Sequence, residues 1–254
     1  MIRSLVLGLA VFAVAACGGP QRPRLPDRVI KRALAGAPGE AQPSKIVAVE
    51  LAFARAAKEK GQWTAFREFA GPGAIIDGQG GPIEAQDWLA NRQDPPAAVQ
   101  WEPRSIWMSC NGALAVSQGR FRDPDGVVGT FVTVWQRQSN DQYRWIYDTG
   151  APDNPQPPAR KPLAPPEEGD IVVEAMDAVQ GLVADCPKRG EAVPAPPAIS
   201  LSDEIQQGSG ISHDGTLQWR WEHDADGSRR VVAEFLQRGK WVVALDQPFP
   251  VAKQ

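Results

Sequence analysis

The stretch Gly126–Gly150, GVVGTFVTVWQRQSNDQYRWIYDTG, decides the fold of the central domain. It reads as two strands joined by a tight turn, because apolar and aromatic residues alternate on either side of the polar run Ser139–Gln142. Side chains alternate along a strand, so one face of the first strand is expected to hold Phe131, Thr133 and Trp135. On the returning strand, one face is expected to hold Tyr143, Trp145 and Tyr147, and the other Arg144, Ile146 and Asp148.

The composition is that of a folded domain with linkers. The chain has 254 residues, 43% of them hydrophobic, and nine tryptophans, which is ample for a core. A net charge of -3 with 22% charged residues gives no sign of a nucleic-acid binder. The 24 prolines are clustered, and such clusters mark linkers.

Residues 1–17 read as a lipoprotein signal peptide. The apolar run Leu5–Ala13 follows Arg3 and is too short for a membrane-spanning helix of about 20 residues. The run Val14-Ala15-Ala16-Cys17 resembles the bacterial lipobox, which implies cleavage before Cys17 and lipidation of its thiol. The alternative is an ordinary signal peptide with an incidental cysteine. Gly18 replaces the Asp typical of inner-membrane retention, so we expect a lipid anchor in the outer membrane, facing the periplasm.

Proline-rich stretches divide the rest of the chain. Residues 18–43 are expected to form a tether, residues 44–152 the main domain, and residues 153–168 a second linker. Residues 169–254 form a companion region, in which 170–182 reads as a helix or as a segment that ends in a strand, the helix being favoured. Three strands are expected beyond it, at 216–223, 229–237 and 240–245, in a small hairpin sheet.

Two cysteines remain in the mature chain, Cys110 and Cys186. Export to an oxidising compartment would allow them to pair. Sequence alone cannot bring them within bonding distance, so two buried thiols remain the alternative.

The main domain is expected to begin with helices and to end in strands. Ser44 reads as the N-cap of a helix that ends at Gly61, and a second short helix follows it. A very short strand is expected at Ala74–Asp77, and then a helix from Pro82 to about Arg92. Four antiparallel strands follow, at 98–109, 113–121, 126–138 and 143–150.

This order, with particular motifs, resembles the nuclear-transport-factor-2-like superfamily, in its SnoaL-like or unknown-function (4440) branch. The motifs are Glu50–Ala57 (ELAFARAA), Phe66–Ile76 before Gly78, Trp88-Leu89, Trp101-Glu102-Pro103, Val132–Gln138 (VTVWQRQ) and Trp145–Gly150 (WIYDTG). The resemblance covers about residues 44–152. It implies an α+β fold in which a cone-shaped curved antiparallel sheet wraps around helices and leaves a pocket at its open end. A small β-rich C-terminal extension would follow, and homodimers through the outer face of the sheet are common in the superfamily.

Candidate catalytic residues are restricted to carboxylates. The chain has two histidines, His213 and His223, both expected near surface turns, so neither a zinc site nor a cofactor is expected. Enzymes of the resembling fold use a pocket carboxylate for proton transfer, which makes Glu50, Asp77 and Asp148 the candidates. Glu50 shares the apolar face of its helix, and its carboxylate can instead be satisfied by helix N–H groups or by an arginine such as Arg120.

Aromatic side chains are expected to line the ligand-binding pocket. The candidate wall residues are Phe53, Trp88, Trp101, Arg120 and Trp135, with core and dimer packing as the alternative for the tryptophans. The sequence favours a non-catalytic, lipid-anchored periplasmic protein that binds a small apolar or aromatic ligand, serves as a dimeric envelope module, or both. The alternative is an isomerase or cyclase in which Glu50 or Asp77 transfers the proton.

Overall fold

The computed structural model describes residue 29 and residues 40–158, 178–188, 191–199 and 205–251. The expected signal peptide with Cys17, nearly all of the tether, residues 159–168 of the linker and residues 170–177 lie outside the described residues. All elements below belong to one compact unit, residues 34–254. None of the helices in the described ranges is long and apolar enough to cross a bilayer.

Three helices precede or interrupt the first strands: α2 (Pro43–Lys60), α3 (Gln62–Phe69) and α4 (Ala85–Leu89). The helix α2 begins at Pro43, one residue before the expected N-cap Ser44, because proline has the preset φ that suits a first helical position. Gly61, at a φ of 112°, separates α2 from α3. The expected helix from Pro82 is wrong over its first residues, because Gly81–Glu84 forms the edge strand β2, where proline's missing N–H costs no ladder bond.

The main sheet has seven strands in the order β2-β1-β6-β5-β4-β3-β7. Their bounds are β1 Ala70–Gly78, β2 Gly81–Glu84, β3 Gln100–Met108, β4 Leu114–Arg122, β5 Val128–Arg137, β6 Tyr143–Pro152 and β7 Gln180–Val183. The four antiparallel strands expected from the sequence are confirmed as β3–β6. The sheet as a whole is mixed, since β1 pairs with β6 and β7 pairs with β3 in parallel. The favoured helix at 170–182 is therefore wrong over residues 180–182, and the alternative, a segment that ends in a strand, is confirmed there, because these residues pair with β3.

A β-bulge in β6 changes the expected faces of the central hairpin. Val134 lies opposite Tyr147 and Trp135 lies opposite Trp145, so Ile146 is an extra residue without a partner. As a result, Trp145 packs in the helix-side core and Tyr147 packs on the other side of the sheet. The expectation that these two aromatic residues share a face is wrong. The same bulge turns Asp148 to the helix side.

The second sheet has four antiparallel strands in the order β11-β10-β9-β8, not the three expected. Their bounds are β8 Gln206–Ile211, β9 Leu217–His223, β10 Arg229–Gln237 and β11 Lys240–Phe249. The sequence does not predict strand β8, because Gly208 and Gly210 interrupt the alternation of apolar and polar residues that is typical of a strand. Both glycines are needed: a Cβ at Gly208 would lie 2.5 Å from the indole nitrogen of Trp221, and one at Gly210 would lie 2.6 Å from that of Trp219.

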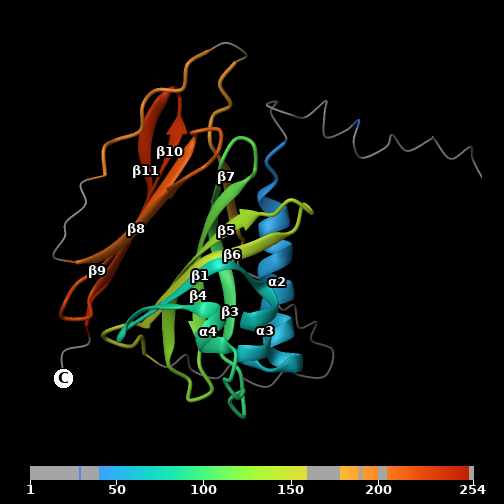
Figure 1. The fold of residues 1–254 in the computed structure, drawn as a ribbon. Coiled ribbons are helices and arrows are strands. Elements are labelled where there is room, and N and C mark those ends of the chain that lie inside the picture. Colours follow the sequence, from blue (N-terminus) through green and yellow to red (C-terminus); the bar gives the residue numbers. More distant parts are fainter. Residues whose placement is uncertain (1–28, 30–39, 159–177, 189–190, 200–204, 252–254) are drawn as a thin grey trace, which may run out of the picture. The chain divides into compact units, whose positions relative to one another are not determined.

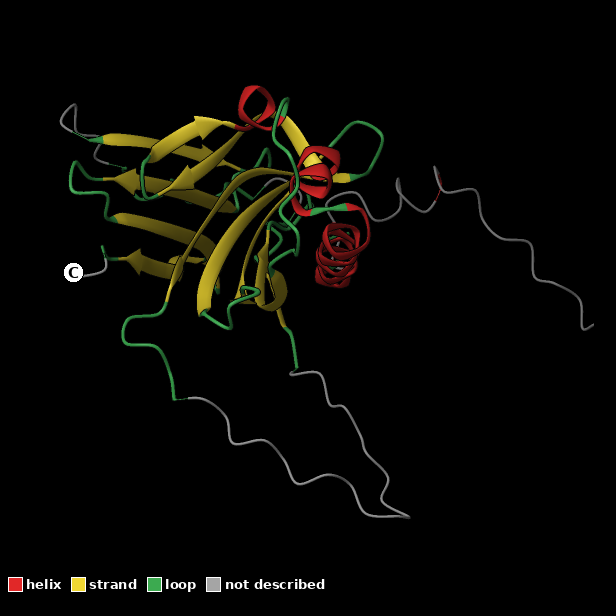
Figure 2. Cartoon of the chain, turned by 90° about the horizontal axis from the view of Figure 1, so that it is seen from below, coloured by secondary structure: helices red, strands yellow, loops and turns green. Residues whose placement is uncertain are grey.

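Two apolar cores lie on opposite faces of the seven-stranded sheet. The helices cover one face, and the second sheet packs on the other through Trp219 and Trp221 (Figures 1 and 2). Tyr147 stacks on Trp221 at 5.7 Å between ring centroids. The face on which the resemblance placed a dimer contact is thus occupied by this chain's own strands, and the homodimer stays a prediction.

The disulfide Cys110–Cys186 is present, and its cysteines are separated by 76 positions in the sequence. It joins the turn after β3 to the segment after β7. The same region carries hydrogen bonds to the second sheet, among them Cys110 N–H to Thr216 Oγ1 at 2.9 Å. The disulfide therefore links two segments that follow strands of the first sheet, and the hydrogen bonds tie the second sheet to this region.

Candidate functional site

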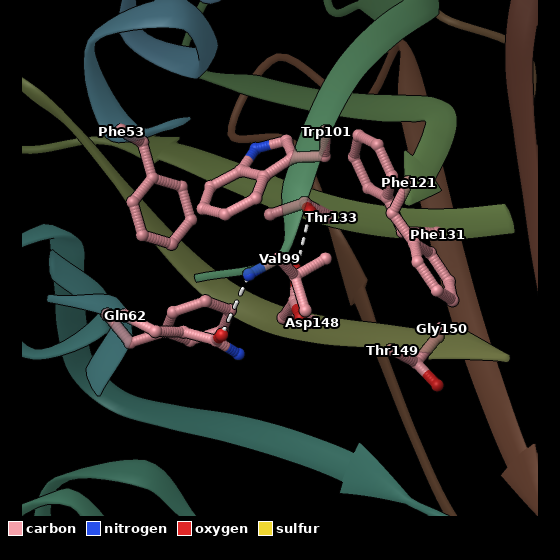
Figure 3. Close-up of a pocket in the computed structure, with 11 residues that line it drawn as sticks. Phe53, Gln62, Val99, Trp101, Phe121, Phe131, Thr133, Asp148, Thr149 and Gly150 are labelled. Carbon is pink, nitrogen blue, oxygen red and sulfur yellow. Dashed lines mark hydrogen bonds between the residues drawn. The ribbon is translucent and has the colours of Figure 1, made fainter. Parts of the chain in front are cut away.

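A cavity of about 180 Å³ lies between α2, α3 and the helix-side face of the main sheet (Figure 3). Five of its eleven lining residues are aromatic, and one carries a carboxyl group. The lining residues are Phe53, Gln62, Phe66, Val99, Trp101, Phe121, Phe131, Thr133, Asp148, Thr149 and Gly150.

Cross-strand glycines shape one end of this wall. Phe131 lies over its partner Gly119, where a Cβ would come within 2.6 Å of the phenyl ring. Phe121 lies in the same way over Gly129, at 2.2 Å from such a Cβ. The pairing of glycine with phenylalanine therefore lays both rings flat against the sheet.

Aromatic rings contributed by the helices and β3 form the other end. Phe53 of α2 packs against Phe66 of α3 and Trp101 of β3, with centroids 4.9 and 4.7 Å apart. Both contacts are edge-to-face, the arrangement that aromatic quadrupoles favour. The rings of this wall thus pack against one another, and the cavity that they line can accommodate the ring of a ligand.

Asp148 is the charged group of the cavity. Its Oδ2 accepts a hydrogen bond from the Thr133 hydroxyl at 2.6 Å, and Oδ1 has no hydrogen-bond partner among the described residues. Burial raises the pKa of Asp148 from 3.8 to about 7; the Thr133 bond lowers it, and the nearby Glu50 charge raises it. Although the carboxyl is enclosed by protein, the residue keeps some accessible surface, and it lines the cavity.

Glu50 lies one layer behind the cavity and is fully buried. Its Oε1 accepts hydrogen bonds from the Ser117 hydroxyl (2.5 Å) and the Trp135 indole (2.9 Å), and its Oε2 accepts one from the Trp101 indole (3.3 Å). Burial raises the pKa of Glu50 to about 7, and the three hydrogen bonds lower it. The carboxylate is therefore satisfied as the alternative expected, but by neutral donors and not by helix N–H groups or an arginine.

Asp77 lies on the opposite face of the sheet, away from the cavity. Its Oδ2 accepts a hydrogen bond from the Tyr147 hydroxyl at 2.8 Å, and its Oδ1 lies 2.7 Å from His223 Nδ1. Arg229 donates to the backbone oxygen of Asp77 at 2.6 Å. His223 is buried, so its expected surface position is wrong, whereas His213 is exposed. This cluster joins the two sheets.

The five expected ligand-binding residues do not share one location. Phe53 and Trp101 line the cavity, whereas Trp135 lies beside Glu50 behind it. Trp88 packs against Trp63, and Arg120 pairs with Asp153. Successive side chains along β4 point to opposite faces of the sheet. Phe121 lines the cavity, so its neighbour Arg120 points away from it.

Gln62 is a functional candidate that sequence analysis missed. Its Oε1 accepts a hydrogen bond from the backbone N–H of Val99 at 3.0 Å, while within the described residues its Nε2 has no partner. A polar residue directly after a helix-ending glycine gave no signal of a pocket position. No group of three or more His, Cys, Asp or Glu side chains that could hold a metal ion occurs in the described part of the chain.

No protein-family model and no curated protein matches the sequence. Solved structures similar to this chain include a candidate ketosteroid isomerase from Parabacteroides distasonis, with 16% identity over 41% of this chain and 86% of that one, at a TM-score of 0.35. An NTF2-like protein of unknown function from Mesorhizobium loti has 16% identity over 44% and 94% of the two chains, at a TM-score of 0.29. An NTF2-like superfamily protein from Salmonella enterica has 13% identity over 56% and 100%, at 0.30.

The TM-scores of these three likenesses are too low to assign the fold or a function to this chain. The α+β architecture with its curved mixed sheet rests on the strand order and register described above.

Proposed function

We propose that this protein binds a small aromatic or apolar molecule in the cavity between α2, α3 and the main sheet. The observation that supports this most directly is the cavity of about 180 Å³ walled by the rings of Phe53, Phe66, Trp101, Phe121 and Phe131. An engineered apolar cavity of about 150 Å³ accepts benzene, so this volume suits a single ring with a short substituent. Concave, mostly apolar walls with few polar groups are typical of small-molecule sites.

We further propose that the chain is a SnoaL-like member of the nuclear-transport-factor-2-like superfamily with a cone-shaped main domain. In this proposal it is anchored by lipid at Cys17 in the outer membrane and faces the periplasm. The lipobox-like run before Cys17 and the internal disulfide support export. Metabolic labelling with an alkyne fatty acid tests the anchor: the wild-type chain should take up the label and the Cys17→Ser variant should not.

A cavity-filling variant tests ligand binding. Val99→Phe places a ring in the cavity wall, while Val243→Phe makes the same change at a residue that is 60% exposed on β11. Protein purified from its own host under native conditions should carry a small molecule, detected by native mass spectrometry, in the wild type and in Val243→Phe. Val99→Phe should be empty. Equal loading of the two variants would place the ligand elsewhere and contradict the proposal.

A second candidate function is acid–base catalysis of the isomerase or cyclase type. The specific observation in its favour is Asp148, whose pKa of about 7 suits a general base at neutral pH. Of the three candidate carboxylates it is the one that lines the cavity. Deuterium uptake from D₂O into the α-positions of a panel of small ketones, followed by NMR, should be catalysed by the wild type and lost in Asp148→Asn. If the wild type catalyses no uptake, the catalytic proposal fails and ligand binding remains the proposed function.

A further inference from the structure

The cavity combines aromatic walls with one incompletely paired carboxyl group. We propose that its ligand is a one-ring aromatic compound carrying a protonated amine, with the ammonium group held by Asp148. This inference rests on the proposed binding function and adds the charge of the ligand to it.

The walls suit a cation as well as a ring. Aromatic faces carry partial negative charge and attract ammonium groups, more strongly where water is excluded. Trp101 and Phe131 both line the cavity near Asp148, together with three further rings. A neutral aromatic compound would gain the ring contacts but not this attraction.

Asp148 provides the matching anion. Thr133 occupies its Oδ2, and Oδ1 is without a hydrogen-bond partner in the described residues, so an ammonium N–H can donate to it. Charge-assisted hydrogen bonds of this kind are about twice as strong as neutral ones. Gln62 offers a free Nε2 donor on the same cavity wall, which suits an oxygen acceptor elsewhere on the ligand.

Among the residues that the structure describes, no side chain supplies the counter-charge in the cavity. All lining residues other than Asp148 are neutral, and the charged group that acts on it is Glu50 of α2, also an acid. The facing residues of α3, β3, β4 and β5 carry no charge, nor does Ile76, the β1 partner of Asp148. Arg120 of β4 faces the other side of the sheet and pairs with Asp153. A ligand cation would therefore complete a site in which two acids lie close together.

Binding should consequently be coupled to deprotonation of Asp148. An alkylamine stays protonated up to about pH 10, like lysine. With the pKa of Asp148 at about 7, the carboxylate form rises about tenfold between pH 6 and pH 8. The affinity for an aromatic amine should rise by about the same factor over this range, and that for a neutral aromatic compound should stay constant.

Isothermal titration calorimetry on the full chain tests this with three probes of nearly equal shape: 2-phenylethylamine, 2-phenylethanol and phenylacetate. We expect the amine to bind at least tenfold more tightly than the alcohol at pH 8, and phenylacetate not to bind. Titrations of the amine at pH 7 in two buffers of different ionisation enthalpy should show proton release.

Asp148→Asn should remove the preference for the amine and keep the binding of the alcohol. Asp125→Asn, a change at an exposed turn residue, should leave the preference intact. The pH series is measured on the wild type, so it tests the inference even if the Asp148→Asn variant does not fold. Equal affinity for amine and alcohol at pH 8 would overturn this inference while leaving the proposed binding function in place. No binding of any of the three probes would count against both.

Discussion

Glu50 is an acid buried among neutral donors, and its burial makes the stability of the fold depend on pH. Burial raises its pKa from 4.5 to about 7. A pKa that differs by one between the folded and unfolded states changes the free energy of unfolding by about 1.4 kcal/mol. The folded state binds the proton more tightly than the unfolded state. The Glu50 side chain therefore costs no stability below pH 4.5. The free energy of unfolding falls as the pH rises from 4.5 towards 7, and above pH 7 it is lower by roughly 3 kcal/mol.

Glu50→Gln should remove this loss. Glutamine keeps an oxygen that can accept from Ser117 and Trp135, and it carries no charge to desolvate. Urea unfolding followed by tryptophan fluorescence should show the variant close to the wild type at pH 5 and up to about 3 kcal/mol more stable at pH 8. The free energy of unfolding of the variant should thus depend less on pH.

Glu59→Gln is the matched control, because Glu59 lies on the exposed side of the same helix. Its pH profile should parallel that of the wild type. Asp148 contributes a slope of the same sign in all three proteins. Because the Glu50 charge raises the pKa of Asp148, the difference between the profiles measures Glu50 together with its effect on Asp148. If Glu50→Gln is less stable than the wild type at pH 8, the ionised carboxylate stabilises the fold and the reasoning from burial is refuted.

Three further predictions concern the sheets. Cys110→Ser should lower the free energy of unfolding by about 4 kcal/mol, given the loop that the disulfide closes, and reduction should leave this variant unchanged in a urea titration. Asp77→Asn should cost roughly 3 kcal/mol in thermal unfolding because it breaks a buried ionic cluster, whereas Asp246→Asn, in an exposed pair, should cost under about 1 kcal/mol. Gly119→Ala places a Cβ 2.2 Å from the carbonyl oxygen of Glu102 and 2.6 Å from the ring of Phe131, so it should shift both and weaken binding of 2-phenylethanol. Gly80→Ala, in open space, should not weaken binding; equal binding by the two variants would refute the role of Gly119.

The sequence predicted the parts of the fold that depend on local pattern. The alternation in Phe131–Trp135 and the turn at Ser139–Gln142 gave the central hairpin correctly. The bulge at Ile146 has no such local signature, because any residue can be the extra one. One added residue reverses every later side chain, which is why Asp148 reached the cavity and Tyr147 the second sheet.

The sequence predicted the candidate site only in part. Glu50, Phe53 and Trp101 were recognised from helical spacing and from aromatic character, and all three lie at or behind the cavity. The surface position expected for His223 was wrong because its partner Asp77 is distant in sequence and belongs to the other sheet. Contacts between sheets follow from packing, and no local pattern contains them.

The proposed function requires that an aromatic ligand occupy the cavity beside Trp101. Proton–nitrogen correlation NMR tests it directly, because the indole N–H of Trp101 reports on the cavity and that of Trp241, which donates to Pro194 at 2.9 Å, reports on the second sheet. Titration with 2-phenylethylamine should shift the Trp101 signal and leave that of Trp241 in place. A shift of Trp241 alone, or no shift of either signal at saturating probe, would show that the cavity does not bind the aromatic probe.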